Sequence, residues 1–261
     1  MKKSHPLNTL YMTFIYLFFY APIGVLMIYS FNNANYSLVW NGFTTKWYTI
    51  LFHDSSLWIA ALHSVIVGLL SASTATLIGT LAAVSLYRYR FMGKHLLNGM
   101  VFILIVTPDI VMGISLLLLF SLFHLALGFW SLLLAHITFC IPFVVVTLYS
   151  RISGMDRNIF EAAKDLGAKE FTIFKKITIP LLLPAIISAV LLCFTLSFDD
   201  VMISYFVSGP SFEILPLKIY SMARLGVKPE LNALCSVTFF LTLLMVVISQ
   251  KISRKNESNL S

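Results

Sequence analysis

Charged side chains are scarce in this chain of 261 residues, where Asp, Glu, Lys and Arg together make up 11%. A water-soluble domain carries roughly 25% charged residues and about 45–50% apolar ones. Here the apolar share is 59%, and the mean hydropathy is +0.89. So few charges exclude a cytosolic enzyme, a nucleic-acid-binding protein and a disordered chain. The composition favours a protein embedded in a lipid bilayer.

Cysteine is rare as well. Cys140, Cys193 and Cys235 lie far apart within apolar stretches. They fit neither a disulfide framework nor the ligand spacing of a zinc site, so we expect buried thiols.

Motifs that bind phosphates or metals are missing from the sequence. The only Gly-Lys pair is Gly93-Lys94, and five residues before it stands Arg88 instead of the glycine of a P-loop. The six histidines form no pair spaced by four residues, and no G-x-S-x-G elbow is present. We therefore predict no catalytic residue, no metal site and no cofactor in this chain.

Long apolar runs are what the sequence has instead. Six of them are near the roughly 20 residues that cross a bilayer as a helix. They are Leu10–Phe31, Trp58–Leu86, Leu96–Phe123, Leu125–Tyr149, Leu181–Phe206 and Leu231–Ser249. The first is longer than the apolar core of a signal peptide and lacks a cleavage site after it, so we expect a retained anchor.

Lys and Arg are distributed unequally over the segments between these runs. With the N-terminus inside, fourteen of the eighteen lie in inner segments: Lys2, Lys3, Arg88, Arg90, Lys94, Arg151, Arg157, Lys164, Lys169, Lys175, Lys176, Lys251, Arg254 and Lys255. The outer segments hold Lys46, Lys218, Arg224 and Lys228. The positive-inside rule therefore predicts that both termini lie in the cytoplasm.

Prolines lie inside four of the runs, at Pro22, Pro108, Pro142 and Pro184. Each removes a helix donor and frees a carbonyl, which in lipid must find another partner. We expect kinks at these positions.

The longest inner loop, Ser150–Pro180, is the least apolar part of the chain. Asp156 can cap the start of a helix, and Ile159, Ala163 and Leu166 then form one apolar stripe at helical spacing. Periodicity alone does not distinguish a helix with a specific function from an amphipathic helix that only lies on the membrane surface. Gly167 suits a left-handed C-cap that turns the chain into a second short helix, Lys169–Lys176.

A spaced motif in this loop separates these interpretations. Glu161-Ala162-Ala163 is followed after three residues by Gly167 and, after nine more, by Ile177-Thr178-Ile179-Pro180. This pattern resembles the EAA loop of ABC-importer permeases, written EAA-x3-G-x9-I-x-L-P. The one departure is Ile179 in place of Leu, which conserves volume.

This resemblance implies an all-α polytopic membrane protein: a type I ABC importer permease with six transmembrane helices and a single permease domain over residues 1–261. In that family the EAA loop, here about residues 150–180, forms a coupling helix that docks on an ATP-hydrolysing subunit. By that resemblance Ala162 and Ala163 allow close approach, Gly167 makes the turn, and Glu161 offers a polar contact. Ile177 and Pro180 close the motif. ATP and Mg²⁺ would be bound by the partner.

Three acidic residues lie within the apolar runs: Asp109, Asp199 and Asp200. An intramembrane carboxylate costs about 2.5–3.5 kcal/mol, and no Lys or Arg lies inside a run to pair with it. At ~1.5 Å per residue, Asp109 and Asp199 fall in the outer half of the membrane. Asp199 and Asp200 point ~100° apart on a helix, so they need not face the pathway together. One of them can instead cap a helix.

Carboxylates along a pathway favour a cationic substrate, whereas an anion pathway would use Arg or helix N-termini. Trp47, Tyr20 and Tyr149 are aromatic candidates for the same pathway, because an aromatic face attracts a cation. Interfacial belts and packing are the commoner uses of such residues.

The wider sequence is similar to the permeases of spermidine/putrescine ABC importers. The matching runs are NGFTTKWYTILF, TPDIVMGISLLLLF, HITFCIPFVVVTLYSR, EAAKDLGAKEFTIF, LSFDDVMISYFVSGPS and EILPLKIYSM. The resemblance implies a polyamine substrate, a bacterial inner-membrane location and three kinds of protein partner. These are a homologous second permease, a dimer of ATP-binding subunits and a periplasmic polyamine-binding protein, with membrane lipid around them.

Two alternatives remain open. An ABC permease for another cation, such as iron or thiamine, would share the loop and the carboxylates. A stand-alone secondary transporter would not need the EAA loop, and its inverted repeats are not evident in the sequence.

Overall fold

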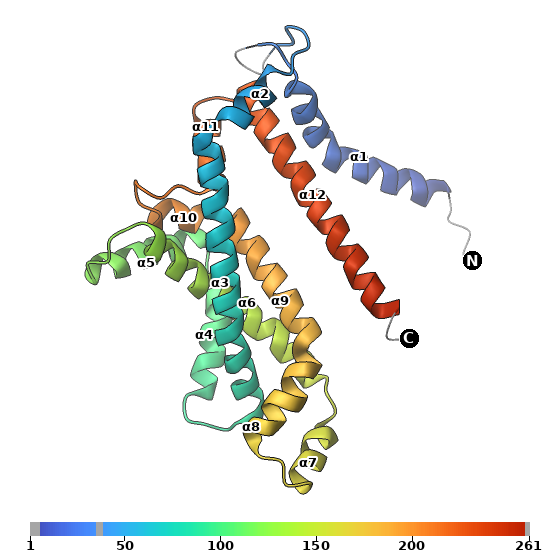
Figure 1. Ribbon diagram of the computed structural model, residues 1–261, viewed down its shortest axis with the longest axis vertical. Coiled ribbons are helices and arrows are strands. Elements are labelled where there is room, and N and C mark those ends of the chain that lie inside the picture. The colour runs from blue at the N-terminus through green and yellow to red at the C-terminus, as the bar shows by residue number, and fades with distance from the viewer. Residues whose placement is uncertain (1–5, 35–38, 259–261) are drawn as a thin grey trace. The chain divides into compact units, whose positions relative to one another are not determined.

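The computed structural model describes residues 6–34 and 39–258, which are mainly α-helical (Figure 1). Within these ranges the only β pairing is an isolated bridge between Asn32 and Phe43. Lys2 and Lys3, which contribute to the orientation argument, lie outside the described residues. The chain packs as two compact units, of which one is Ile59–Leu217 and the other combines the residues up to Trp58 with those from Lys218 onward. A single permease domain over the whole chain stays a prediction.

The unit formed by the two chain ends contains α1 (Pro6–Tyr29), α2 (Lys46–His53) and α12 (Pro229–Ser258). Helix α12 packs against both α1 and α2. Trp47 of α2 is buried, and its indole N–H donates to the Asn32 carbonyl at 2.8 Å. The Asn32 side chain in turn donates to the Val39 carbonyl and accepts from the Asn41 amide. Trp47 therefore fixes the α1–α2 connection to α2.

A polar cap separates α2 from α3 (Ser55–Arg88). The Asp54 carboxylate accepts the Ser56 amide at 2.8 Å and the Ser56 hydroxyl at 2.7 Å. The hydroxyl bond is the main reason that the pKa of Asp54 lies below its ordinary value. This arrangement starts α3 at the residue after Asp54.

The unit Ile59–Leu217 contains most of α3 and eight further elements before α11 (Leu215–Arg224). They are α4 (Lys94–Val106), α5 (Asp109–Leu122), α6 (Phe129–Ser153), α7 (Arg157–Asp165), α8 (Glu170–Ile173), the π-helix η1 (Phe174–Thr178), α9 (Ile179–Asp199) and α10 (Met202–Val207). Helices α7 and α8 lie at one end of this unit, and α5 and α10 at the other (Figure 1).

Close packing of α3, α6 and α9 forms the core of this unit. A Cβ placed on Gly79 of α3 would lie 2.6 Å from Val144 of α6, so only glycine permits this approach. Cys140 of α6 and Cys193 of α9 are buried, and each thiol contacts the other residue's carbonyl. The prediction of buried thiols is confirmed for these two, whereas Cys235 is half-buried.

The membrane spans partly follow the six expected runs. In the part of the chain that the structure describes, four helices are long and apolar enough to span a membrane: Thr9–Tyr29, Ser55–Arg88, Phe129–Ser153 and Glu170–Asp199. The pair α4 and α5 qualifies only as a bent unit, with 116° between the two helices. The apolar part of the last run is a shorter helix, Pro229–Leu244.

Two runs expected as single helices are interrupted. Leu96–Phe123 breaks at Thr107 and Pro108, because Thr107 is extended before a proline that lacks an N–H. Leu181–Phe206 breaks at Asp200 and Val201, where α9 ends and α10 begins. The expectation of a continuous helix was wrong in both runs, although the kink at Pro108 is present.

Candidate coupling site and substrate pathway

The start of the coupling loop, defined here as Ser150–Pro180, follows the predicted cap. The Asp156 carboxylate accepts the Asn158 amide at 3.0 Å at the start of α7. The apolar stripe differs from the expected one, because Phe160 and Ala163 are buried while Ile159 and Leu166 are exposed. The reason is tertiary packing, because Phe160 and Ala163 contact the helix that follows the turn at Gly167.

A left-handed turn at Gly167 supplies that packing. Gly167 has φ +77°, its N–H donates to the Lys164 carbonyl, and the Ala168 N–H donates to the Ala163 carbonyl. This is the C-cap predicted from the sequence. The turn brings the buried Ile173 of α8 against Phe160 and Ala163 of α7. The face of α7 that looks inward is therefore set by α8.

The second short helix expected over Lys169–Lys176 is not separate. Glu170–Asp199 forms one continuous helical span, in which η1 joins α8 to α9. Pro180 removes one donor in the first turn of α9, and the wider π turn beside it accommodates this loss. The coupling loop thus continues directly into the span α9.

The EAA motif divides between two faces. Glu161 and Ala162 are exposed on α7, whereas Ala163 is buried and Ile177 is half-buried in the same small cluster. Pro180 is exposed at the start of α9. The outward face therefore offers a carboxylate beside a methyl group, which permits close approach by another surface.

An ion pair that sequence reasoning missed fastens this loop to α3. The guanidinium of Arg88, at the end of α3, lies 2.7 Å from the Glu170 carboxylate and also stacks on the Phe160 ring. Lys164 lies 3.0 Å from the other Glu170 oxygen. Arg88 and Glu170 are far apart in the chain, and each alone resembles an ordinary surface charge.

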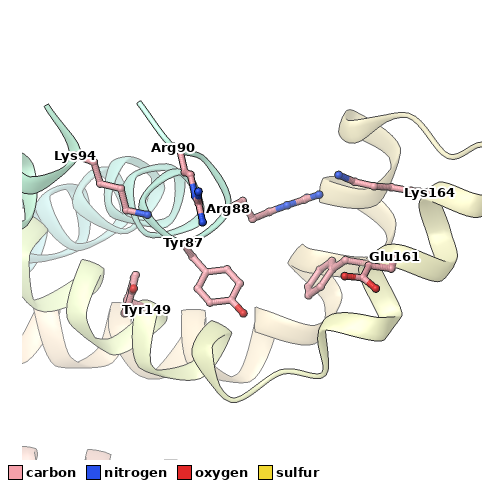
Figure 2. Close-up of a pocket in the computed structure, with 8 residues that line it drawn as sticks. Tyr87, Arg88, Arg90, Lys94, Tyr149, Glu161 and Lys164 are labelled. Atoms are coloured by element: carbon pink, nitrogen blue, oxygen red, sulfur yellow. The ribbon is translucent and has the colours of Figure 1, made fainter. Parts of the chain in front are cut away.

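A basic pocket of about 440 Å³ opens beside this ion pair (Figure 2). Its lining residues are Tyr87, Arg88, Arg90, Lys94, Tyr149, Phe160, Glu161 and Lys164. Tyr149, a predicted pathway residue, lies here with its ring edge-to-face against Tyr87.

The predicted pathway carboxylates lie at helix breaks in the same unit. Asp109 is the first residue of α5, directly after the bend that follows α4, and Asp199 is the last residue of α9; both are exposed. Tyr20 is exposed on α1, whereas Trp47 is buried in the other unit's packing. The structure therefore leaves Asp109, Asp199 and Tyr20 accessible and gives Trp47 a structural contact.

Asp200 has different surroundings from its neighbour. Its buried carboxylate accepts the Ile203 and Ser204 amides and the Ser204 hydroxyl at the start of α10. The imidazole of His136 lies 3.4 Å away. Of the two adjacent acids, Asp200 is the one that caps a helix.

The Asp200 cap belongs to a buried network of side-chain hydrogen bonds that the sequence did not indicate. His136 of α6 bonds Ser204 through Nε2 and Ser197 of α9 through Nδ1. The Ser71 hydroxyl of α3 donates to Ser197 at 3.0 Å. This network joins α3, α6, α9 and α10 inside the apolar core. In the part of the sequence that the structure describes, no group of three His, Cys, Asp or Glu side chains is placed to hold a metal.

Comparisons with known proteins agree with this architecture. Residues 75–255 match the family described as binding-protein-dependent transport system inner membrane component. The chain is 57% identical over 244 residues to the spermidine/putrescine transport system permease protein PotC of Escherichia coli strain K12, covering 94% of this chain and 92% of that protein. It is 44% identical to the putrescine transport system permease protein PotI of the same strain, covering 85% and 82%.

The fold recurs in a solved structure. A chain of a bacterial ABC transporter that imports the acidic polysaccharide alginate superimposes with a TM-score of 0.73 over 94% of each chain, at 17% identity. Because the family match covers more than half of the chain and relatives at 57% and 44% identity align along most of it, this multi-pass membrane protein belongs to the binding-protein-dependent transport system inner membrane components.

Proposed function

We propose that this chain is the permease subunit of an ABC importer that moves polyamines into the cytoplasm. The observation that carries the choice of substrate is the similarity to permeases named for spermidine and putrescine, at 57% and 44% identity. The partners in this proposal are a homologous permease, two ATP-binding subunits and a periplasmic polyamine-binding protein. ATP and Mg²⁺ are bound by the ATP-binding subunits.

The coupling loop receives the movement of an ATP-binding subunit. Glu161 and Ala162 form the exposed contact face of α7, and the Gly167 turn holds α7 against α8. From there two connections lead into the membrane. The Glu170–Arg88 ion pair transmits motion to α3, and the continuous helix from Glu170 to Asp199 transmits it along α9.

The opposite end of the same unit carries the substrate pathway. Asp199 ends α9, where unpaired carbonyls add partial negative charge to its carboxylate, and this combination attracts a cation. Asp109 lies at the second helix break. Broken helices in transporters commonly form such ion sites, because their free backbone groups line a cavity.

The membrane potential assists this transport in the predicted orientation. Spermidine carries about three positive charges, and each gains about 2.3 kcal/mol per 100 mV on moving inward. The total is about 7 kcal/mol at 100 mV, so the permease needs a transient site and a seal against leak more than a strong pull.

Removing the charge of Asp109 tests the pathway. Asp109→Asn keeps the shape and is expected to reduce uptake of labelled spermidine by whole cells about tenfold or more, because a polyamine that passes through the membrane then lacks this counter-charge. The matched control is Asp54→Asn, since Asn retains the capping oxygen that Ser56 needs. Wild-type uptake by Asp109→Asn at equal membrane abundance would remove Asp109 from the pathway.

Competition separates polyamines from the other cations that the sequence left open. Unlabelled putrescine and spermidine are expected to suppress uptake of labelled spermidine, whereas thiamine and ferric iron are not. Suppression by thiamine or iron at a lower concentration than by polyamines would assign the permease to that cation instead.

A further inference from the structure

The basic pocket lies where three apolar helices end. Helix α3 ends at Arg88, α4 begins at Lys94, and Tyr149 lies one turn before the end of α6. All three helices continue from these positions into apolar segments, two of them long enough to span a membrane. Side chains at such positions lie at the depth of the lipid headgroups.

Two of the cations that line this pocket are already paired. Arg88 and Lys164 share the Glu170 carboxylate. In residues 6–34 and 39–258, by contrast, no carboxylate lies within ion-pair distance of Arg90 or Lys94.

The two remaining cations reach the pocket from one side. Arg90 and Lys94 extend over Tyr87 and Tyr149, with their charged ends toward the same space (Figure 2). The Lys94 ammonium donates to the Tyr89 carbonyl at 3.3 Å and keeps further donors. Glu161 lies on α7 at the far side, where Lys164 also lies. The part of the pocket nearest the α3–α4 turn is therefore positive and offers only donors and tyrosine hydroxyls.

The turn that carries these cations also displays apolar side chains. Tyr89, Phe91 and Met92 are 47%, 40% and 102% exposed. Aromatic rings and cations adjacent to each other at the end of a span are typical of the membrane–water interface, where the rings lie among the headgroups.

We propose that this pocket binds the phosphate headgroup of an anionic phospholipid from the inner leaflet. Arg90 and Lys94 contact the phosphate oxygens, and the hydroxyls of Tyr87 and Tyr149 are within the same pocket for the polar part of the headgroup. A membrane lipid fits better than an acidic side chain of an ATP-binding subunit, because both cations project from the turn between two apolar helices. The contact face for that subunit is on α7.

The bound lipid would stabilise the coupling loop in a defined position. One wall of the pocket belongs to the α3–α4 turn and the other to α7, so a headgroup between them holds the loop against the ends of α3 and α4. Anionic lipid then favours ATPase coupling. Lipid binding itself needs neither a polyamine nor ATP, and its measurement is independent of the proposed transport function.

Native mass spectrometry of the full chain, purified from neutral detergent with its copurifying subunits, tests the site by titration with phosphatidylglycerol. Each basic side chain near an anionic lipid is worth about fivefold in affinity. We therefore expect Arg90→Gln and Lys94→Gln each to weaken binding about fivefold, and the double variant about thirtyfold. The matched control, Arg151→Gln with Lys176→Gln, removes one Arg and one Lys that are exposed in the same unit but do not line the pocket, and it is expected to bind as the wild type does.

Three kinds of result would overturn the proposal. The first is wild-type phosphatidylglycerol affinity in the double variant, or equal binding of phosphatidylcholine by the wild type. The second is complete displacement of the lipid by soluble glycerol 3-phosphate at the same concentration, which would assign the pocket to a soluble phosphate ligand. The third is a double variant that loses the ATP-binding subunit but still binds the lipid. This result would assign the pocket to a protein partner. If the wild-type protein binds the lipid as expected but takes up no polyamine, the transport proposal fails and the lipid site stands.

Discussion

Asp199 and Asp200 are neighbours in the chain, yet their carboxylates have different surroundings. Asp199 is exposed at the end of α9. Asp200 is buried, caps α10 through two amides, and lies beside His136. Because a buried acceptor with several donors is costly to remove, Asp200 has a structural role, and Asp199 alone is left for the transport role proposed above.

Substituting each acid with alanine tests this separation. Asp200→Ala leaves the Ile203 and Ser204 amides and the Ser204 hydroxyl without their acceptor, at about 1–3 kcal/mol for each unsatisfied buried group. We expect its melting temperature in detergent to fall by several degrees. Asp199→Ala is expected to melt as the wild type does and to take up less polyamine. Equal melting temperatures for both variants would contradict the structural role of Asp200.

The same residues show what sequence reasoning can and cannot find. An aspartate inside an apolar run was recognisable as an unusual residue, because a charge in a membrane needs a partner. His136 was not, since its partners Ser197 and Ser204 lie 61 and 68 residues away. A lone histidine in an apolar run carries no local sign of such contacts.

The coupling loop shows the same limit for a whole element. The Asp156 cap and the Gly167 turn were predicted correctly because both depend on the backbone nearby. The buried face of α7 was predicted only in part: Ala163 is buried as expected, but Phe160 is buried in place of Ile159 and Leu166, because Ile173 packs on Phe160 and Ala163 after the turn. The helix breaks follow the same rule: Pro108 is a local signal, whereas the break at Asp200 depends on donors that follow it.

Two adjacent alanines on α7 test its two faces. Ala163 is buried against Ile173, so Ala163→Leu adds volume to a filled cluster and is expected to cost about 1–3 kcal/mol. Ala162 is exposed, so Ala162→Leu is expected to leave the loop folded but to obstruct docking of the ATP-binding subunit.

Copurification of that subunit and limited proteolysis of the loop distinguish the two effects. Ala162→Leu is expected to lose the subunit while its loop resists protease, and Ala163→Leu is expected to become protease-sensitive. A protease-sensitive Ala162→Leu variant would show that the exposed face is needed for folding and not for docking.

Across the whole molecule, the asymmetry of Lys and Arg was the strongest signal in the sequence. It predicts a cytoplasmic coupling loop and a periplasmic connection between α11 and α12. The structure supplies a well-exposed side chain in each, because Leu166 is 88% and Leu225 is 79% exposed. These two positions allow the orientation to be measured without altering a packed residue.

Cysteine labelling gives that measurement. Leu166→Cys and Leu225→Cys are introduced separately with Cys235→Ala, since Cys140 and Cys193 are buried and unreactive. A membrane-impermeant maleimide added to intact spheroplasts is expected to label position 225 and to leave position 166 unlabelled until the membrane is lysed. The chain with Cys235→Ala alone controls for the two buried thiols. Labelling of position 166 in intact spheroplasts would show that the orientation is the opposite of the predicted one. A coupling loop on the outer side has no access to cytoplasmic ATP-binding subunits, so the coupling proposal would also fail.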